Sequence, residues 1–136
     1  MGDGDGRLRV LLDTNAFVRL VAEPARLSAR AATLIEASEV LLLSAVSIFE
    51  IDYKRRFKRD VILHSLPADL LPLLQMQPFQ LLSLSPLAAQ AAGRLPLAHR
   101  DPFDRMLVAQ ALEQGVPLIS SDEDLLREAA DTPVVW

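Results

Sequence analysis

The stretch Leu8-Arg9-Val10-Leu11-Leu12-Asp13-Thr14-Asn15 decides the fold of this 136-residue chain. Its apolar run, 8–12, is short and ends at a charged residue, which is the pattern of a strand buried on both faces. Phe17, Leu20 and Val21 then follow at the spacing of one helix face. The stretch therefore predicts a buried strand, a helix directly after it, and Asp13 at the carboxyl end of the strand.

The same alternation of strand and helix continues along the chain. Further strands are expected at 40–43, 79–84 and 116–120, with an edge strand at 134–136. Helices are expected at 14–23, from 28, and at 44–59, 67–77, 86–94, 101–114 and 123–130. Continuous apolar strands that alternate with helices predict an α/β protein, a three-layer α/β/α domain with a four- or five-stranded, mainly parallel sheet.

Composition limits the function classes. The length suits one domain, here 7–136, preceded by a glycine-rich tail at 1–6 that we expect to be flexible. The absence of cysteine excludes disulfides, thiolate metal sites and thiol catalysis. No apolar stretch is long enough to span a bilayer and the start resembles no signal peptide, so we expect a cytoplasmic protein with no membrane contact. The net charge of −4 argues against a general nucleic-acid binder.

Four acidic residues each stand in a recognisable local context. Asp13 and Asp122 follow predicted strands, whereas Glu50 and Asp104 lie near the starts of predicted helices. In a parallel α/β sheet these places converge on the crevice at the carboxyl ends of the strands. Carboxylates gathered there repel one another unless a cation joins them, and all-oxygen ligands suit Mg²⁺ or Mn²⁺. The pattern indicates a metal-dependent phosphodiesterase.

Each acid has a predicted role in that chemistry. Asp13 and Asp104 are expected to be the principal metal ligands, Glu50 to bind the metal or orient the attacking water, and Asp122 to complete the site or hold a second ion. Supporting contacts are expected from Asn15, Asp101 and Ser120. Structural roles remain open as well: Asp13 could cap the first helix, Asp101 and Asp104 could complement a helix dipole, and Asp122 could be a turn residue. His99 is expected to be a loop residue or a supporting contact rather than a general base.

A dense basic run follows Glu50. Its cations are Lys54, Arg55, Arg56, Lys58 and Arg59. Such a run can be a solvated helix end, where cations complement the dipole, or a rim that contacts RNA phosphates. The sequence leaves both readings open.

Four blocks of the chain together resemble a known family. They are Leu11-Leu12-Asp13-Thr14-Asn15, Ser44-Ala45-Val46-Ser47-Ile48-Phe49-Glu50-Ile51, His99-Arg100-Asp101-Pro102-Phe103-Asp104-Arg105-Met106-Leu107-Val108-Ala109-Gln110-Ala111 and Leu118-Ile119-Ser120-Ser121-Asp122. In order and spacing these blocks resemble PIN-domain ribonucleases and, more narrowly, the VapC toxins of bacterial type II toxin–antitoxin systems. The resemblance runs from Leu8 to Trp136. One departure is Ser120-Ser121, where the family more often has Thr-Asn.

The resemblance implies a Mg²⁺- or Mn²⁺-dependent endoribonuclease that a cognate antitoxin holds inactive. Carried over by position, the family's acidic quartet falls on Asp13, Glu50, Asp104 and Asp122. The antitoxin is expected to place an arginine or lysine among these carboxylates. A homodimer or a toxin–antitoxin hetero-oligomer is also implied, and the apolar residues of 67–77 could form the dimer contact: Leu70, Leu71, Leu74 and Met76.

Two other classes compete with this interpretation. A response-regulator receiver domain would need a phospho-accepting aspartate that ends a central strand and a lysine that ends a later one. Here the strand at 79–84 is followed by Ser85 and the last lysine is Lys58, which excludes that class. A catalytically silent PIN-like interaction module remains open, although the presence of all four acids speaks against it.

Overall fold

The computed structural model describes residues 7–57, 61–128 and 133–136. The predicted tail, 1–6, lies outside the described residues, and so do Lys58 and Arg59 of the basic run. None of the described helices combines the length and the apolarity that a membrane span requires.

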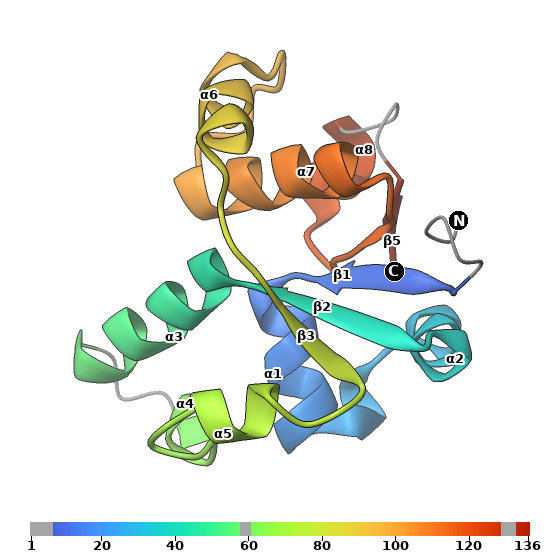
Figure 1. Cartoon of the computed structure of the whole chain (residues 1–136), viewed down its shortest axis with the longest axis vertical. Helices are drawn as coiled ribbons and strands as arrows, with labels where there is room; N and C mark the ends of the chain where they lie inside the picture. Colours follow the sequence, from blue (N-terminus) through green and yellow to red (C-terminus); the bar gives the residue numbers. More distant parts are fainter. Residues whose placement is uncertain (1–6, 58–60, 129–132) are drawn as a thin grey trace.

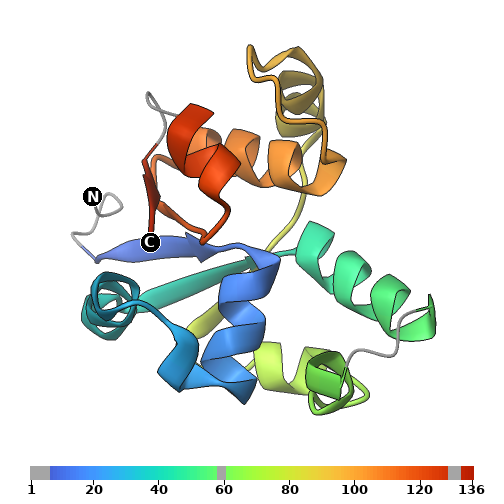
Figure 2. The same cartoon turned by 180° about the vertical axis from the view of Figure 1, so that it is seen from behind.

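Five parallel strands form one sheet in the order β3-β2-β1-β4-β5. Their bounds are β1 (Arg9–Leu12), β2 (Val40–Ser44), β3 (Phe79–Leu82), β4 (Leu118–Ile119) and β5 (Val134–Val135). The prediction of a mainly parallel sheet with four or five strands is confirmed. β2 is one residue longer than expected, and the other strands are shorter. The figures show the sheet between two groups of helices, with α6, α7 and α8 on one face and α1, α2, α4 and α5 on the other (Figures 1 and 2).

The helices alternate with the strands as predicted. Their bounds are α1 (Thr14–Ala22), α2 (Ala29–Ala37), α3 (Ala45–Phe57), α4 (Val61–His64), α5 (Leu71–Leu74), α6 (Pro86–Arg94), α7 (Pro102–Gln114) and α8 (Glu123–Glu128), with a short 3₁₀ turn at Pro24–Arg26. Glycine fixes the end of α7, because Gly115 has φ 64° in the left-handed region, where a side chain is strained.

Side chains of each central strand alternate between two apolar cores. Val10 and Leu12 of β1 pack in the core on the α1 side, whereas Leu11 packs in the core on the α7 side. Alternation with period two sends neighbours to opposite faces, so a parallel strand covered on both faces must be apolar throughout. Each buried leucine contributes roughly 1.5–3 kcal/mol, and these cores fix the position of the residues that follow the strands.

One predicted helix is wrong. The segment 67–77 forms only the single turn α5, and a second short turn, α4, precedes it. Pro72 lacks a backbone N–H and is accommodated only in the first turn of a helix, so a helix that began near Pro67 could not continue through it. The predicted apolar face is divided as a result: Leu70 and Leu74 are buried in the core, and Leu71 and Met76 are exposed.

The strand order reverses at β1. The chain passes from β1 outward to β2 and β3 and then returns to place β4 on the other side of β1. Strands β1 and β4 are also joined at their carboxyl ends. The N–H of Asp13, which follows β1, donates to the carbonyl of Ile119, the last residue of β4, at 3.0 Å. In open α/β sheets ligands bind at such a reversal, outside the carboxyl ends of the strands.

Candidate active site

Asp13 lies at the reversal point and is only 4% exposed. Its Oδ1 accepts a hydrogen bond of 2.7 Å from the Ala16 N–H, which caps α1. The side chain of Ser120, buried after β4, also hydrogen bonds to Asp13. The capping role and the placement at the sheet edge are therefore both present, and Ser120 lies beside Asp13.

Burial makes Asp13 an unusually weak acid. It raises the pKa of the carboxyl from 3.8 to about 7; the hydrogen bonds from Ser120 and Ala16 lower it, and the charges of Asp104 and Glu50 raise it further. A carboxylate in this position favours a bound cation, because the cation would offset both the desolvation and the repulsion by its neighbours.

Glu50, on α3, is buried and has contacts at both carboxylate oxygens. The Thr14 hydroxyl hydrogen bonds to Oε1 at 2.6 Å, and Lys54 forms an ion pair with Oε2. Thr14 Oγ1 also lies 2.9 Å from the hydroxyl of the buried Ser47. These contacts fix the orientation of Glu50 beside the start of α1. Sequence reasoning missed Thr14 and Ser47, because only the sheet topology brings two residues 33 positions apart into contact.

Asp104 lies in the first turn of α7 and is joined to His99. The His99 Nε2 and the Asp104 Oδ2 are 2.8 Å apart. Burial raises the pKa of Asp104, the hydrogen bond from His99 lowers it, and the charges of Asp101 and Asp122 raise it, so that the net change is upward. Asp101 caps α7, because its Oδ1 accepts from the N–H groups of Phe103 and Asp104 at 2.8 and 3.2 Å.

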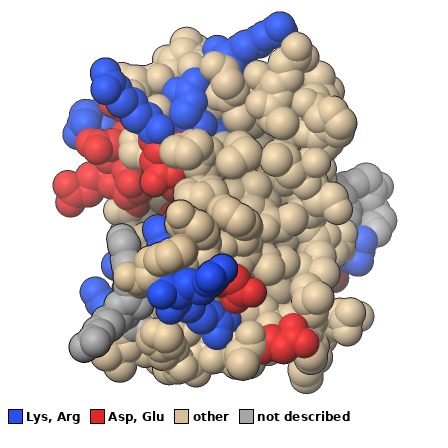
Figure 3. All heavy atoms as spheres, turned by 90° about the vertical axis from the view of Figure 1, so that its left-hand side faces the viewer, with Lys and Arg blue, Asp and Glu red and all other residues tan. Residues whose placement is uncertain are grey.

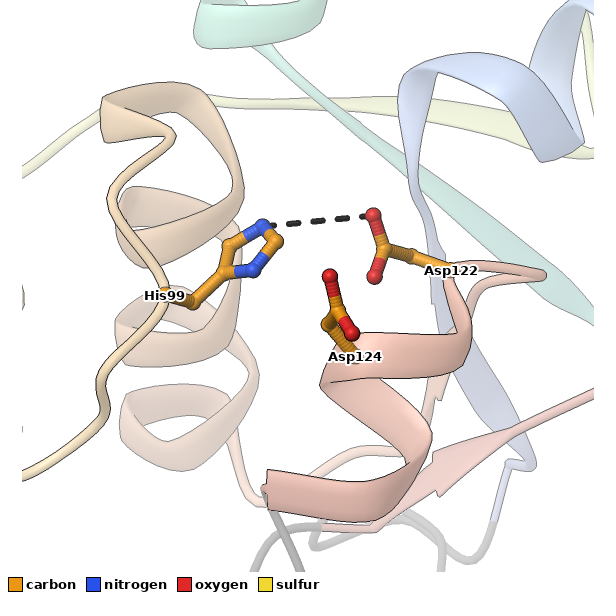
Figure 4. A group of neighbouring side chains, drawn as sticks. All are labelled: His99, Asp122 and Asp124. Atoms are coloured by element: carbon orange, nitrogen blue, oxygen red, sulfur yellow. Dashed lines mark ion pairs between the residues drawn. The ribbon is translucent and has the colours of Figure 1, made fainter.

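His99 connects Asp104 to the acids beside β4. Figure 4 shows its imidazole directed from the loop between α6 and α7 toward Asp122 and Asp124. The distance from Nε2 to the Asp122 Oδ2 is 3.9 Å. Burial lowers the pKa of His99, but its hydrogen bond with Asp104 and the charges of Asp104, Asp122 and Asp101 raise it, and the net change is upward. Asp122 also accepts from the Leu125 N–H at 3.0 Å at the start of α8.

The loop that carries His99 is held by one arginine. Three nitrogens of the Arg105 guanidinium donate to backbone carbonyls of the last turn of α6 and of the segment between α6 and α7. The closest acceptors are Ala92 at 3.0 Å, Leu95 at 2.8 Å, Leu97 at 2.8 Å and His99 at 3.0 Å. A planar fork of donors suits such a set of acceptors. Sequence reasoning assigned Arg105 no role, because no local pattern reveals these contacts.

The four predicted acids form one electrostatic cluster. Asp13 is influenced by Asp104 and Glu50, and Asp104 is influenced by Asp122. Asn15, expected to support the site, is exposed at the start of α1. The donors here are mainly carboxylate oxygens, which is the donor set that Mg²⁺ and Mn²⁺ prefer, and one ligand atom each of His99, Asp122 and Asp124 lie within 4.8 Å of one another. The raised pKa of buried Asp13 shows that its charged form lacks a compensating cation. The residues present therefore fit a divalent cation.

The described cations of the basic run have different surroundings. Lys54 pairs with Glu50, whereas Arg55 donates to the Pro67 carbonyl at 2.8 Å and so holds α3 to the following loop. Arg56 lies over the Phe57 ring, 5.5 Å from its centroid. Figure 3 shows acidic atoms gathered in a patch on one face, with basic atoms above and below it.

The fold and the acidic edge together define a class of protein. The chain belongs to the PIN domain family, whose model matches residues 10–131. This match confirms the resemblance seen in the four sequence blocks.

Individual relatives agree with that assignment. The chain is 34% identical to Ribonuclease VapC22 of Mycobacterium tuberculosis over 131 residues, which cover 93% of this chain and 98% of that protein. Among solved structures, the fold resembles VapBC-5 from Mycobacterium tuberculosis, with a TM-score of 0.62, 19% identity and coverage of 93% of this chain and 95% of that chain. FitAcB from Neisseria gonorrhoeae gives a TM-score of 0.62 at 22% identity, with 93% and 96% covered.

Proposed function

We propose that this chain is a cytoplasmic metal-dependent endoribonuclease, the toxin of a VapBC-like toxin–antitoxin system. The observation that carries the proposal is the gathering of Asp13, Glu50, Asp104 and Asp122 at the strand-order reversal of a PIN domain. Support comes from the relative named as a ribonuclease, which the chain matches over nearly its whole length. The reaction is hydrolysis of an RNA phosphodiester bond.

The chain's own residues would hold a Mg²⁺ or Mn²⁺ ion and keep its ligands in place. Asp13 and Asp104 are the principal ligands, with Glu50 and Asp122 completing the site. When bound, the ion activates a water molecule and neutralises charge on the phosphate oxygens. Ser120 and the Ala16 N–H orient Asp13, Thr14 and Lys54 orient Glu50, and His99 orients Asp104. Arg56 supplies positive charge for RNA on the side of α3, and Lys58 and Arg59 of the predicted rim lie outside the described residues.

An antitoxin would silence this site by supplying a cation. A guanidinium placed among the carboxylates binds them bidentately and would relieve the same repulsion that a metal ion relieves. Solved structures of similar fold are toxin–antitoxin complexes, including VapBC2 from Rickettsia felis bound to a DNA fragment from their promoter, at 15% identity. Inhibition by the antitoxin should therefore compete with metal.

Cleavage of a fluorogenic RNA by the purified chain, freed of antitoxin, tests the proposal. Cleavage is expected with Mg²⁺ or Mn²⁺, and EDTA should abolish it. Asp13→Asn, which keeps the shape of the side chain, should also abolish it. A catalytically silent interaction module would give no cleavage under any of these conditions, and that result would reject the enzyme.

A further inference from the structure

An aromatic strip runs along the exposed side of α3. Phe49, Tyr53 and Phe57 recur every four residues and so share one face of the helix. They are 55%, 52% and 66% exposed. The rings contact one another: Phe49 and Tyr53 are stacked with centroids 5.5 Å apart, and Tyr53 and Phe57 have centroids 5.0 Å apart. Three of the seven aromatic residues of the chain thus lie on one exposed surface and not in the core.

The first ring of the strip contacts the start of α7. Phe49 precedes Glu50 in α3, and its ring lies 5.9 Å from that of Phe103, the residue before Asp104. An apolar hollow of about 320 Å³ opens beside these two rings. It is lined by Ala45, Val46, Phe49, Leu84, Phe103 and Met106. The strip therefore begins at rings whose residues neighbour two of the proposed metal ligands, Glu50 and Asp104, in the sequence, and it continues from there along α3.

Cations accompany the strip. Lys54 lies next to Tyr53 and keeps its ammonium at the Glu50 carboxylate, and Arg56 lies over the Phe57 ring. The exposed acid on the same helix, Asp52, has its charge offset by Arg55, with 3.4 Å between the paired atoms. An apolar surface bordered by net positive charge complements a ligand that has flat apolar faces and a negatively charged backbone.

We propose that this strip is a stacking surface for unpaired RNA bases next to the bond to be cleaved. The inference rests on the proposed function and names the substrate form that the same site accepts. Ring positions four residues apart are separated by about 6 Å along a helix axis, which exceeds the roughly 3.4 Å per nucleotide of a duplex strand. The strip therefore fits bases that are spread out in a single strand and not a base-paired helix. Because the rings touch, bases lie on the strip rather than between its rings.

Binding of single-stranded RNA, measured by fluorescence anisotropy in EDTA so that no cleavage occurs, tests the proposal. Tyr53→Ala and Phe57→Ala should each weaken binding of a labelled, unstructured RNA octamer by about 5- to 100-fold, the loss expected for one base–aromatic stack. Tyr53→Phe should bind like the wild type and Tyr53→Leu should not. Leu87→Ala, which removes another exposed apolar side chain on α6, should change nothing.

An abasic octamer, with the same sugar–phosphate backbone, separates stacking from charge. Wild type and Tyr53→Ala should bind the abasic octamer equally weakly, because it has no bases that could stack on the rings. If Tyr53→Ala and Phe57→Ala bind the base-bearing octamer as the wild type does, the strip is not an RNA surface. Loss of a dimer in sedimentation with unchanged RNA binding would instead assign it to contact between copies. Failure of the wild type to cleave RNA with Mg²⁺ or Mn²⁺ would reject the proposed function, whereas cleavage with unaffected strip variants would reject the strip alone.

Discussion

At the scale of single residues, the observed role of Asp13 as a helix cap and its proposed role as a metal ligand have different requirements. As a helix cap it needs only one oxygen and little charge, and the hydrogen bond from Ala16 satisfies it. As a metal ligand it must be an anion in a buried place, which is costly without a cation. The pKa of about 7 follows from this conflict. The metal-free protein thus carries a local instability that the bound ion, or an antitoxin arginine, would remove.

The first prediction is a dependence of stability on pH in the metal-free protein. The pKa of Asp13 is about 7 in the folded state, against the ordinary 3.8, so between these values the folded state keeps a proton that the unfolded state has lost. Stability from this group is therefore full below about pH 4 and falls as the pH rises through 7, by an amount on the order of 4 kcal/mol. Urea unfolding in EDTA at several pH values should show this fall.

The control for that experiment is Asp13→Asn, which cannot ionise. The difference in unfolding free energy between wild type and variant should shift toward the variant as the pH rises from 4 to 8. A difference that stays constant over this range would mean that Asp13 ionises normally and that its burial has no cost.

The second prediction concerns Asp104. Asp104→Asn should lower RNA cleavage by about a hundredfold or more, since even outer partners of metal ligands are worth 10- to 100-fold. Expressed alone in a bacterial host, the variant should permit growth where the wild type arrests it. Binding to the antitoxin should weaken only modestly, because Asp13, Glu50 and Asp122 would still offer carboxylates to its cation. A variant that remained fully toxic would show that the site is misassigned.

Local sequence patterns were sufficient to place the acids at the ends of strands and helices, but not to predict the residues that contact them. Asp13 and Asp122 could be placed because each follows an apolar run, and Asp101 because it precedes a proline at the start of a helix. The contact of Thr14 with Glu50 depends on how α1 and α3 leave neighbouring strands. No pattern within one segment contains that information.

At the scale of elements, the loop between α6 and α7 behaves as part of the site. It has no regular structure, yet Arg105 ties its backbone to the first turn of α7, the turn that carries Asp104. A loop so held keeps His99 at the carboxylates without a strand or helix of its own. The sequence indicates such a device poorly, because arginine at a helix start is ordinarily read as a surface charge.

The third prediction tests this device. Arg105→Lys keeps the charge but replaces the fork by one ammonium, so most of the carbonyl contacts are lost. Destabilisation of roughly 1.5–3 kcal/mol is expected, the size of hydrogen bonds to a charged group. Amide exchange at 97–101 should become faster while exchange in β1 and β2 is protected as before. The matched control is Arg94→Lys on the exposed end of α6; equal effects of the two substitutions would contradict the role of Arg105.

Prediction of the elements failed in the segment 67–77, because proline can either begin a helix or interrupt one. Pro67 and Pro86 both suit a helix start, but only Pro86 begins a helix of full length, since a second proline, Pro72, interrupts the other segment. The predicted apolar face is absent for the same reason. Leu70 and Leu74 pack in the core on the α1 side and do not face a partner.

At the scale of the whole molecule, the sheet order explains why distant acids meet. Strands β1 and β4 are neighbours although more than a hundred residues separate them, and each delivers an aspartate to the same edge. The helices that follow β2 and precede β4 deliver Glu50 and Asp104. The alternation of apolar runs was enough to predict that the acids share one edge, because parallel strands have all their carboxyl ends at one edge. It did not predict that β4 lies next to β1.

The fourth prediction is dimerisation. Two of the four residues predicted for the contact, Leu71 and Met76, remain exposed near α5 and are available for it. Sedimentation at micromolar concentration should give twice the mass of one chain, and Leu71→Asp should shift the protein toward the monomer. A wild-type monomer at that concentration would contradict the prediction.

Direct titration with Mn²⁺ tests the central claim, that the four acids form one metal site. Isothermal calorimetry at pH 6 in two buffers of different ionisation enthalpy should show binding with release of a proton, because Asp13 is largely protonated there without metal. Asp13→Asn should abolish the binding and the proton release. The control, Asp52→Asn, changes an exposed acid and should leave both unchanged. Binding of Mn²⁺ that is unaltered in Asp13→Asn, or no binding by the wild type, would contradict the account.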